Sequence, residues 1–546
     1  MAMTTLDRPR STNAPGPARA ARGRSVAVVG AGPGGLASAM LLASSGLSVT
    51  VYEAHSTVGG RTRRLEEGPY RFDCGPTFFM MPWVLEEIFA ATGRRLADYA
   101  KLTRLDPMYR LLIGQPSGDP LVIDTTQDLA RMERQLDAVN PGDGAAFQRF
   151  IRDNRRKLER MTPLLRRPIR GMRDLVAMDT LRVGPLLRPW QSLYDHLGGY
   201  FGSESVRLAM SFQSKYLGMS PFECPELFSI LPFIEYEYGI WHPEGGCNAL
   251  MAAMAQACQE MGVEIRCGAP VERVLFDGRR ACGVAVAGEE RRHEHVVLNA
   301  DASWALSKLV PEHLRPRALS DASLERKRYS CSTFMLYLGL EGEVDLPHHT
   351  IYTSRSYVEN LRDISERGRI SADPSTYICN PSRTDPTLAP AGHSALYLLV
   401  PTPNNQPGFC QVDWRLAAGD LRERALQQAE QVFGIADIRR RIRAERMVTP
   451  ADWEGERIRF GATFNLAHGL GQMLHRRPHH RVQGMDNLWL VGGGTHPGSG
   501  LPVIFLSAEI TAKLLCAELG APCPLSASRG ARPAEPAQLA SALLAG

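Results

Sequence analysis

Two segments near opposite ends of the chain share one order of hydrophobic and polar positions. Residues 25–54 read SVAVVGAGPGGLASAMLLASSGLSVTVYEA, and residues 485–519 read MDNLWLVGGGTHPGSGLPVIFLSAEITAKLLCAEL. In both, a short apolar run precedes a glycine-rich stretch, and a longer run of helix-forming residues follows. A short apolar run of this kind is typical of a buried parallel strand. The pattern therefore predicts two strand–loop–helix units.

In the first unit, residues 26–29 predict a strand and residues 36–43 a helix that ends at Gly46. Residues 48–52 predict a second strand, and Glu53 stands at its end. This order of strand, glycines, helix, strand and acid is typical of a dinucleotide-binding unit.

The glycines of this unit have separate tasks. Gly30 permits the tight turn, Gly32 lets the backbone approach a pyrophosphate, and Gly35 lets the helix pack closely on the strand. Gly34 lies within the same stretch and belongs to the same predicted site. The start of the helix offers free N–H groups to phosphates. Glu53, about 20 residues further on, is the predicted acceptor for the ribose hydroxyls.

In the second unit, residues 488–491 predict a strand, residues 492–500 a backbone-exposing loop, and a half-buried helix is expected from Val503. A glycine-rich loop that opens a helix is a second seat for an anion or for the polar atoms of a flavin. We therefore expect both ends of the chain to line one cofactor. His496 precedes a proline in this loop and is interpreted as a hydrogen-bonded scaffold residue rather than as a general base.

Composition limits the classes of protein. A chain of 546 residues exceeds one ordinary core, so two intertwined domains are expected. Its net charge is +5 with the arginines spread along the chain, which argues against a nucleic-acid-binding protein. No apolar run approaches the roughly 18–20 residues of a membrane span. The eleven cysteines contain no C-x-x-C pair, which argues against disulfides and zinc and for a reducing cytoplasm.

Three further motifs carry a family resemblance. GGRTRRL begins at Gly59, FDCGPT spans residues 72–77, and LVGGGTHPGSGLP spans residues 490–502. They resemble the flavin-dependent amine oxidase and carotenoid desaturase superfamily. The last one is similar to the C-terminal signature of bacterial phytoene desaturases. The likeness covers about residues 24–520, and the segments 212–235 and 460–480 lean toward the dehydrosqualene (diapophytoene) desaturases.

The resemblance implies FAD as the cofactor and assigns further residues to it. Gly59, Gly60 and Arg61 are expected near the pyrophosphate, and the backbone of Val271 near the adenine. The positions expected near the ribityl chain and pyrophosphate are Gly493, Gly494 and Thr495, and those expected near the flavin ring are Gly500, Leu501, Pro502 and Val503.

The implied fold class is α/β (α+β overall), with a Rossmann-like FAD-binding domain, an interleaved substrate domain and a helical membrane-facing part. The FAD-binding parts are predicted at residues 24–100, 237–310 and 456–520. Residues 101–236 are predicted as the substrate- and membrane-associated part, and residues 311–455 as the substrate domain. Residues 1–23 and 521–546 are expected to be a disordered arm and a flexible tail.

The resemblance implies an FAD-dependent oxidoreductase that removes hydrogen pairs from a linear isoprenoid polyene, phytoene or 4,4'-diapophytoene. One hydrogen leaves as a hydride to the flavin and its neighbour as a proton. The polyene stabilises the developing allylic cation, so no strong base is required, and the sequence singles none out. Oxygen or a membrane quinone is the expected electron acceptor, because a second G-x-G-x-x-G unit for a nicotinamide cofactor is absent.

A basic stretch suggests a membrane surface. Residues 149–188 hold twelve Lys or Arg against four Asp or Glu, mixed with leucines, which suits anionic headgroups as well as a solvated face. The expected location is cytoplasmic, at the inner face of the cell membrane. An apolar tunnel or an ordinary core would explain Met219, Leu227, Phe228, Ile230, Leu231 and Phe233. A metal site is not expected at His475, His479 and His480, because Arg476, Arg477 and Arg481 would repel a cation.

Three alternatives remain at this point. A carotenoid oxidase or isomerase-like enzyme shares both FAD clusters but differs in chemistry. An amine oxidase encloses its flavin with aromatic side chains, whereas this loop offers Pro502 and Val503. A prenyl-binding escort protein shares the fold without flavin chemistry, and the intact set of Gly30, Glu53 and Arg61 argues against it.

Overall fold

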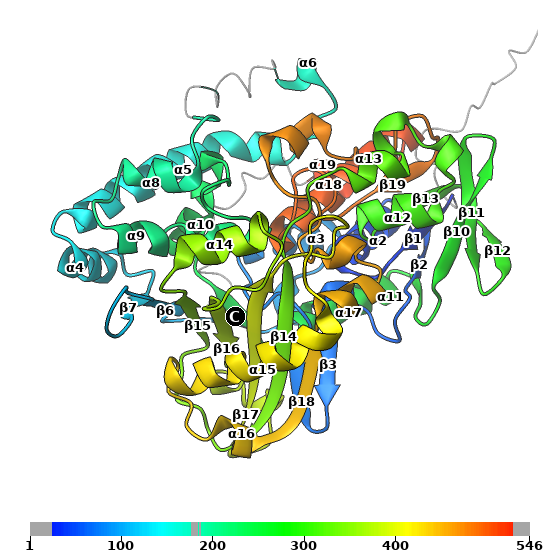
Figure 1. The fold of residues 1–546 in the computed structure, drawn as a ribbon. Helices are drawn as coiled ribbons and strands as arrows, with labels where there is room; N and C mark the ends of the chain where they lie inside the picture. Colours follow the sequence, from blue (N-terminus) through cyan, green and yellow to red (C-terminus); the bar gives the residue numbers. More distant parts are fainter. Residues whose placement is uncertain (1–23, 176–183, 185–186, 528–546) are drawn as a thin grey trace, which may run out of the picture.

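The computed structural model describes residues 24–175, 184 and 187–527. A five-stranded parallel sheet has the order β19-β13-β1-β2-β9. Its strands are β1 (Ser25–Val29), β2 (Ser48–Tyr52), β9 (Glu264–Arg266), β13 (His295–Leu298) and β19 (Leu488–Leu490). Three distant parts of the sequence therefore build one sheet, as Figure 1 shows.

Helices and a small sheet cover the two faces of this parallel sheet. One face packs against α2 (Pro33–Ser44), α3 (Pro82–Ala91), α11 (Cys247–Glu260) and α18 (Leu501–Leu519). The other face packs against α12 (Ala302–Leu309) and an antiparallel sheet of β10 (Val271–Asp277), β11 (Arg280–Val286) and β12 (Glu289–Arg292). In β1, Val26 and Val28 belong to the first core, and Ala27 and Val29 to the second. Because both faces are buried, the strand is apolar at every position.

A second, seven-stranded sheet has the order β18-β14-β17-β16-β15-β6-β7, with only β15 and β6 parallel. Its strands are β6 (Tyr109–Ile113), β7 (Leu121–Thr125), β14 (Ser332–Glu341), β15 (His349–Thr353), β16 (Thr376–Cys379), β17 (His393–Thr402) and β18 (Ile442–Val448). The long helix α15 (Trp414–Gln431) covers one face. Side chains of the opposite face, including Met335, Tyr377 and Tyr397, line a large cavity.

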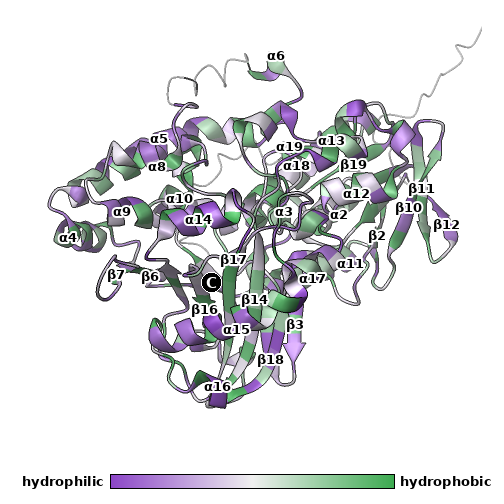
Figure 2. Ribbon diagram, viewed as in Figure 1, coloured by the Kyte–Doolittle hydropathy of each residue, from purple (hydrophilic) through white to green (hydrophobic). Residues whose placement is uncertain are grey.

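A mainly helical part adjoins the edge of this sheet. It contains α4 (Leu129–Val139), α5 (Asp143–Leu165), α6 (Met172–Leu175), α8 (Leu193–Gly198), α9 (Glu204–Ala209), the 3-10 helix η4 (Phe212–Leu217) and α10 (Ile230–Tyr238). Figure 2 shows hydrophilic and hydrophobic residues alternating along α5, whose apolar side joins this part's core. Among the described residues, no helix combines the length and the apolar character that crossing a bilayer requires.

Besides further 3-10 helices, the described chain contains shorter elements. They are η1 (Gly60–Thr62), β3 (Arg64–Glu67), β4 (Tyr70–Asp73), β5 (Leu102–Arg104), β8 (Trp241–Pro243), α13 (Asp321–Glu325), α14 (Tyr357–Ser365), α16 (Ile438–Arg441), α17 (Pro450–Gly455) and α19 (Pro524–Ala527).

The strand–loop–helix prediction is confirmed for both units, with two corrections at helix starts. Helix α2 begins at Pro33 rather than at residue 36, and α18 begins at Leu501 rather than at Val503. In both helices a proline stands in the first turn, where its missing N–H costs nothing. Leu501 and Pro502 therefore belong to the helix and not to the loop.

The predicted arm 1–23 and most of the predicted tail lie outside the described residues. The first tail residues, 521–527, are described. Pro524–Ala527 forms α19, and Leu525 is buried in the core that surrounds α2.

Candidate cofactor and substrate site

One cavity brings the predicted segments together. It encloses about 2420 Å³ of empty space, part of it open to solvent. It lies at the carboxyl ends of β1, β2, β13 and β19, which share one edge because these strands are parallel. The predicted residues that line it are Gly30, Gly32, Glu53, Gly60, Arg61, Val271, Gly493, Gly500, Leu501 and Pro502.

The other predicted residues do not line the cavity; they are Gly34, Gly35, Gly59, Gly494, Thr495 and Val503. Several of them hold the loops in place. A Cβ atom on Gly494 would stand 2.4 Å from the Cβ of Ala302. Thr495 is fully buried and shares a hydrogen bond of 2.8 Å with the Ser507 hydroxyl. Their assignment to the cofactor stays a prediction.

Glu53 connects the glycine turn after β1 with the segment after β2. Its Oε2 atom accepts a hydrogen bond from the backbone N–H of Ala31 at 2.7 Å, and its Oε1 from that of His55 at 2.9 Å. A carboxylate oxygen accepts more than one hydrogen bond, so both retain capacity for the hydroxyls of a ribose. This buried, cavity-lining carboxylate fits the adenosine end of a dinucleotide.

Asn299 is a site residue that the sequence analysis missed. It follows β13, and its Nδ2 atom donates a hydrogen bond of 3.0 Å to the carbonyl oxygen of Gly30. A Cβ atom on Gly34 or Gly35 would stand 2.7 Å from its side-chain amide. Asn299 therefore fixes the glycine turn from behind. The signal for Asn299 in the sequence is its place directly after the apolar run 295–298, which forms the returning strand β13.

Arg61 connects the first half of the chain to the last. Its Nη1 atom donates to the carbonyl oxygen of Thr463 at 2.5 Å and its Nη2 to Oδ1 of Asn465 at 3.0 Å. Asp301 lies 3.8 Å from the same guanidinium. Burial lowers the pKa of Arg61 and raises that of Asp301. With Gly59 and Gly60 in the left-handed conformation just before it, Arg61 presents a fixed cation to the cavity, which fits a pyrophosphate.

The second glycine loop is held by histidines and an arginine. His496 interacts through Nε2 with the carbonyl oxygen of Leu164 at 3.0 Å, and burial lowers its pKa to about 4. A neutral, buried imidazole in this contact confirms the scaffold interpretation. Ser499 donates its N–H to Nε2 of His468 at 3.1 Å. Arg477 donates to the carbonyl oxygen of Gly493 at 3.0 Å.

The histidines near Arg477 serve the scaffold too. His480 pairs through Nδ1 with the Thr511 hydroxyl at 2.9 Å, and His479 contacts the carbonyl oxygen of His475 at 2.9 Å. The first contact ties this segment to α18, and the second lies within the segment.

Beyond the cofactor residues the cavity becomes apolar and aromatic. Its walls there include Phe78, Met80, Phe212, Tyr216 and Ile351. The six residues for which the sequence allowed either a tunnel or an ordinary core are absent from the lining, and they lie in the core of the helical part or pack against it. For these six, ordinary core is the correct interpretation. The tunnel wall comes instead from the second sheet, η4 and the segment after β4.

Lys215 is the second residue that the sequence analysis missed. It lies on η4 and lines the apolar part of the cavity. Its Nζ atom stands 4.8 Å from the centre of the Tyr357 ring, and among the described residues it forms no ion pair within 4.0 Å. Burial lowers its pKa to about 7. A lone lysine in a leucine- and tyrosine-rich stretch gives no signal of this, since the neighbours that bury it come from other segments.

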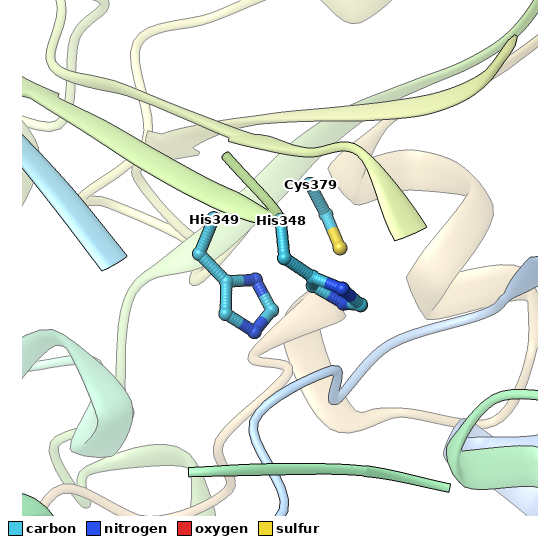
Figure 3. A group of neighbouring side chains, drawn as sticks. All are labelled: His348, His349 and Cys379. Atoms are coloured by element: carbon cyan, nitrogen blue, oxygen red, sulfur yellow. The ribbon is translucent and has the colours of Figure 1, made fainter. Parts of the chain in front are cut away.

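A buried group of His348, His349 and Cys379 has the ligand types that zinc takes, with one ligand atom from each within 4.8 Å of the others (Figure 3). Both Nδ1 atoms are already engaged, that of His348 with the Thr384 hydroxyl at 2.9 Å and that of His349 with the Tyr377 hydroxyl at 2.7 Å. Phe78 stacks on His349 with ring centres 4.1 Å apart. The group supports the cavity wall from behind, because Tyr377 and Phe78 line the cavity while its own three residues do not.

A parallel-sheet dinucleotide site that opens into an apolar cavity under a mixed sheet defines an FAD-dependent oxidoreductase. The chain belongs to the family of flavin-containing amine oxidoreductases, whose sequence pattern matches residues 33–516. The residues that line the cavity fit FAD: a carboxylate for the ribose, a glycine turn and a fixed arginine for the pyrophosphate, and a second glycine loop for the flavin.

Individual relatives agree with this assignment. The chain is 42% identical to a 4,4'-diapophytoene desaturase (4,4'-diapolycopene-forming) of Methylomonas sp over 492 residues, which is 90% of this chain and 94% of the relative. It is also 42% identical to an all-trans-zeta-carotene desaturase of Myxococcus xanthus over 508 residues, 91% and 94% of the two chains.

Solved structures support the fold alone. An oxidoreductase from Methanosarcina mazei superposes with a TM-score of 0.58 at 17% identity, covering 89% of this chain and 98% of its own. A cyclohexylamine oxidase from Brevibacterium oxydans gives a TM-score of 0.56 at 16% identity, covering 91% and 99%.

Proposed function

We propose that this protein is an FAD-dependent carotenoid desaturase that removes hydrogen pairs from a linear isoprenoid polyene. The observation that carries the proposal is the continuity of the cavity. Arg61 and Glu53 line it at the nucleotide end, and Phe78, Phe212 and Ile351 line its apolar part. An apolar chain binds in such a space without leaving a polar group unpaired. The two relatives at 42% identity are both named as desaturases of such polyenes.

Bound FAD supplies a two-electron acceptor for a C–H bond. The protein itself orients the polyene and excludes water. The aromatic wall formed by Phe78, Tyr216 and Tyr377 keeps the polyene in an apolar environment. Two aromatic pairs stiffen it, since Phe78 stands 5.2 Å from Tyr216 and 5.6 Å from Tyr377 between ring centres.

The substrate is tested in cells that supply either phytoene or 4,4'-diapophytoene and that express this chain. Extracted pigments are read by their absorption. New colour from one precursor assigns the chain length, and new colour from both indicates a permissive cavity. Flavin-loaded protein that yields no new colour from either precursor would contradict the proposal. It would favour the runner-up, a carotenoid oxidase or isomerase-like enzyme that acts on a later intermediate.

We further propose that the protein docks on the inner face of the cell membrane, takes its substrate there and passes electrons to oxygen or a membrane quinone. Two large apolar side chains are exposed at the basic segment, Met172 within it with 65% of its surface exposed and Trp190 just after it with 79%. Arg170 and Arg173 are exposed in the same stretch. Exposed apolar side chains among arginines suit an anionic, apolar surface.

Sedimentation with vesicles tests the docking. Trp190→Ser is expected to weaken binding to vesicles that contain anionic phospholipid. Leu416→Ser is the matched control, because Leu416 is equally exposed but lies on α15, away from the basic segment. Equal losses for the two variants, or binding that is indifferent to lipid charge, would contradict the docking surface. An anaerobic flavin assay with added quinone identifies the electron acceptor.

A further inference from the structure

We propose that the amine of Lys215 accepts the proton that the polyene loses during desaturation. The inference rests on the proposed function and adds a residue role to it. A desaturation releases one hydrogen with its electron pair and the neighbouring one as a proton. A site that excludes water needs a group to receive that proton, and Lys215 lies in the apolar part of the cavity.

The segment that carries Lys215 is anchored to the flavin end of the site. Gly218, directly after η4, accepts a hydrogen bond from the N–H of Cys331 at 3.0 Å. A Cβ atom on Gly218 would stand 2.7 Å from the Phe464 ring, so the two segments are in close contact. The N–H of Phe464 donates to the Ser330 hydroxyl at 3.1 Å.

From there, contacts continue into the second glycine loop. The Ser499 hydroxyl donates to the carbonyl oxygen of Phe464 at 2.6 Å, and Asn465, the next residue, accepts from Arg61 at 3.0 Å. Lys215 is therefore fixed relative to the loop whose residues are expected beside the flavin ring.

The surroundings favour the neutral amine. Among the described residues no carboxylate forms an ion pair with Nζ, and the charged form of an unpaired amine is costly away from water. The Cys331 thiol and the Tyr357 ring face the lysine from the neighbouring segments. Burial lowers the pKa of Lys215 to about 7, whereas it raises that of Cys331 to about 12. The lysine is thus ready to accept a proton near neutral pH.

Two phenols in the apolar part of the cavity are poorer acceptors. Burial raises the pKa values of the Tyr216 and Tyr377 phenols, so both remain protonated. Glu235 is fully buried and does not line the cavity. Once Lys215 is protonated, the face of the Tyr357 ring at 4.8 Å stabilises the ammonium.

The step balances. The first C–H bond breaks and its electron pair goes with the hydrogen to FAD, which is reduced. The neighbouring C–H bond breaks, its electron pair forms the new C=C bond, and its proton forms an N–H bond on Nζ. The ammonium returns its proton to water when the cavity reopens. A neutral amine also avoids placing a positive charge beside the allylic cation that develops on the polyene.

The first experiment needs no turnover. FAD-loaded protein is labelled with an amine-reactive reagent at a series of pH values, and labelling of each lysine is read by mass spectrometry. Lys215 is expected to reach half of its maximal rate near pH 7, and bound polyene is expected to block it. Lys101 is the exposed control, with 79% of its side chain accessible, and its labelling profile is compared with that of Lys215. Identical pH profiles for the two lysines would overturn the inference.

The second experiment uses variants. Lys215→Met is expected to lower the desaturation rate constant on the order of 100-fold with flavin content and polyene binding retained, the loss typical of a missing acid–base group. In Lys215→Arg the guanidinium stays protonated and cannot accept a proton, so this variant should lose a similar share of the desaturation rate constant. Lys327→Met is the control, because Lys327 does not line the cavity. A Lys215→Met rate within twofold of wild type would overturn the inference. Wild-type protein that forms no polyene product would instead refute the proposed function, while the labelling profile would still stand.

Discussion

Gly35 of helix α2 lies so close to Gly30 that a Cβ atom on Gly35 would stand 2.1 Å from the Gly30 carbonyl oxygen. That oxygen also accepts the hydrogen bond from Asn299. The turn, the helix and the returning strand β13 thus meet at a point with no room for a side chain. The contact sets the position of the helix start relative to the cavity, and the first N–H groups of that helix are the ones that a pyrophosphate requires.

Gly35→Ala is therefore expected to lower the melting temperature and to abolish stable FAD binding, since neither of the two backbone segments can move freely. Gly419→Ala is the control: Gly419 lies on α15 with open space around it, and alanine there should raise stability by up to about 1 kcal/mol. Thermal scans and the flavin absorbance of purified protein measure both. Normal flavin content in the Gly35 variant would show that the tight contact is not needed.

Glu53→Gln is expected to weaken FAD binding about 10- to 100-fold. The carboxylate accepts from the N–H groups of Ala31 and His55, and an amide would turn its own NH₂ group toward one of these donors. A lost hydrogen bond to a charged group costs about 1.5–3 kcal/mol, which corresponds to that range. Fluorescence titration of flavin-stripped protein gives the dissociation constant. Glu264→Gln on the neighbouring strand β9, at an exposed site, should leave it unchanged.

Lys157, which belongs to the basic segment, forms a buried ion pair of 2.6 Å with Glu226, and at most 6% of either side chain is exposed. Glu226→Gln leaves the ammonium without its counter-charge and should cost about 3–5 kcal/mol. The apolar double variant Lys157→Met with Glu226→Leu is expected to recover much of that loss. Glu244→Gln breaks the exposed pair with Lys101 and should change the melting temperature little. A Glu226→Gln variant as stable as the wild type would show that the ammonium of Lys157 does not need its counter-charge.

Glu235 makes the stability of the folded protein fall as the pH rises. It is fully buried, it accepts hydrogen bonds from Tyr109 at 2.7 Å and Gln213 at 2.9 Å, and burial raises its pKa to about 7. The pKa of Glu235 is higher in the folded state than in the unfolded state. Its contribution to the free energy of unfolding is therefore complete below pH 4.5 and is lost as the pH rises through 7. The loss at full titration is on the order of 3 kcal/mol.

Glu235→Gln should remove this dependence, since an amide does not titrate. The difference in melting temperature between variant and wild type is therefore expected to grow in favour of the variant from pH 5 to pH 8. Glu289→Gln on the exposed strand β12 serves as the control. A difference that stays constant over this range would show that Glu235 does not titrate between these values.

Sequence reasoning reached the nucleotide half of the site because its chemistry is local. Gly30, Gly32 and Glu53 act through spacing along one strand–turn–helix–strand unit, and all three line the cavity. The same reasoning misjudged where helices begin, since Pro33 and Leu501 extend α2 and α18 toward the glycines. It left open whether the apolar residues between Met219 and Phe233 line a tunnel or form an ordinary core. The apolar residues 227–233 pack inside the helical part, because apolar character alone does not distinguish a core residue from one that faces a cavity.

The sequence by itself determined the class of cofactor, since a backbone turn that admits a pyrophosphate needs glycines at a fixed spacing, here Gly30, Gly32 and Gly35. The tertiary structure alone decided the rest. It placed Asn299 behind the glycine turn and joined Arg61 to Thr463 and Asn465, some 400 positions away in the chain. It also enclosed Lys215 in an apolar space beside Tyr357. Burial and charge depend on neighbours from distant segments, and only the folded chain brings those neighbours together.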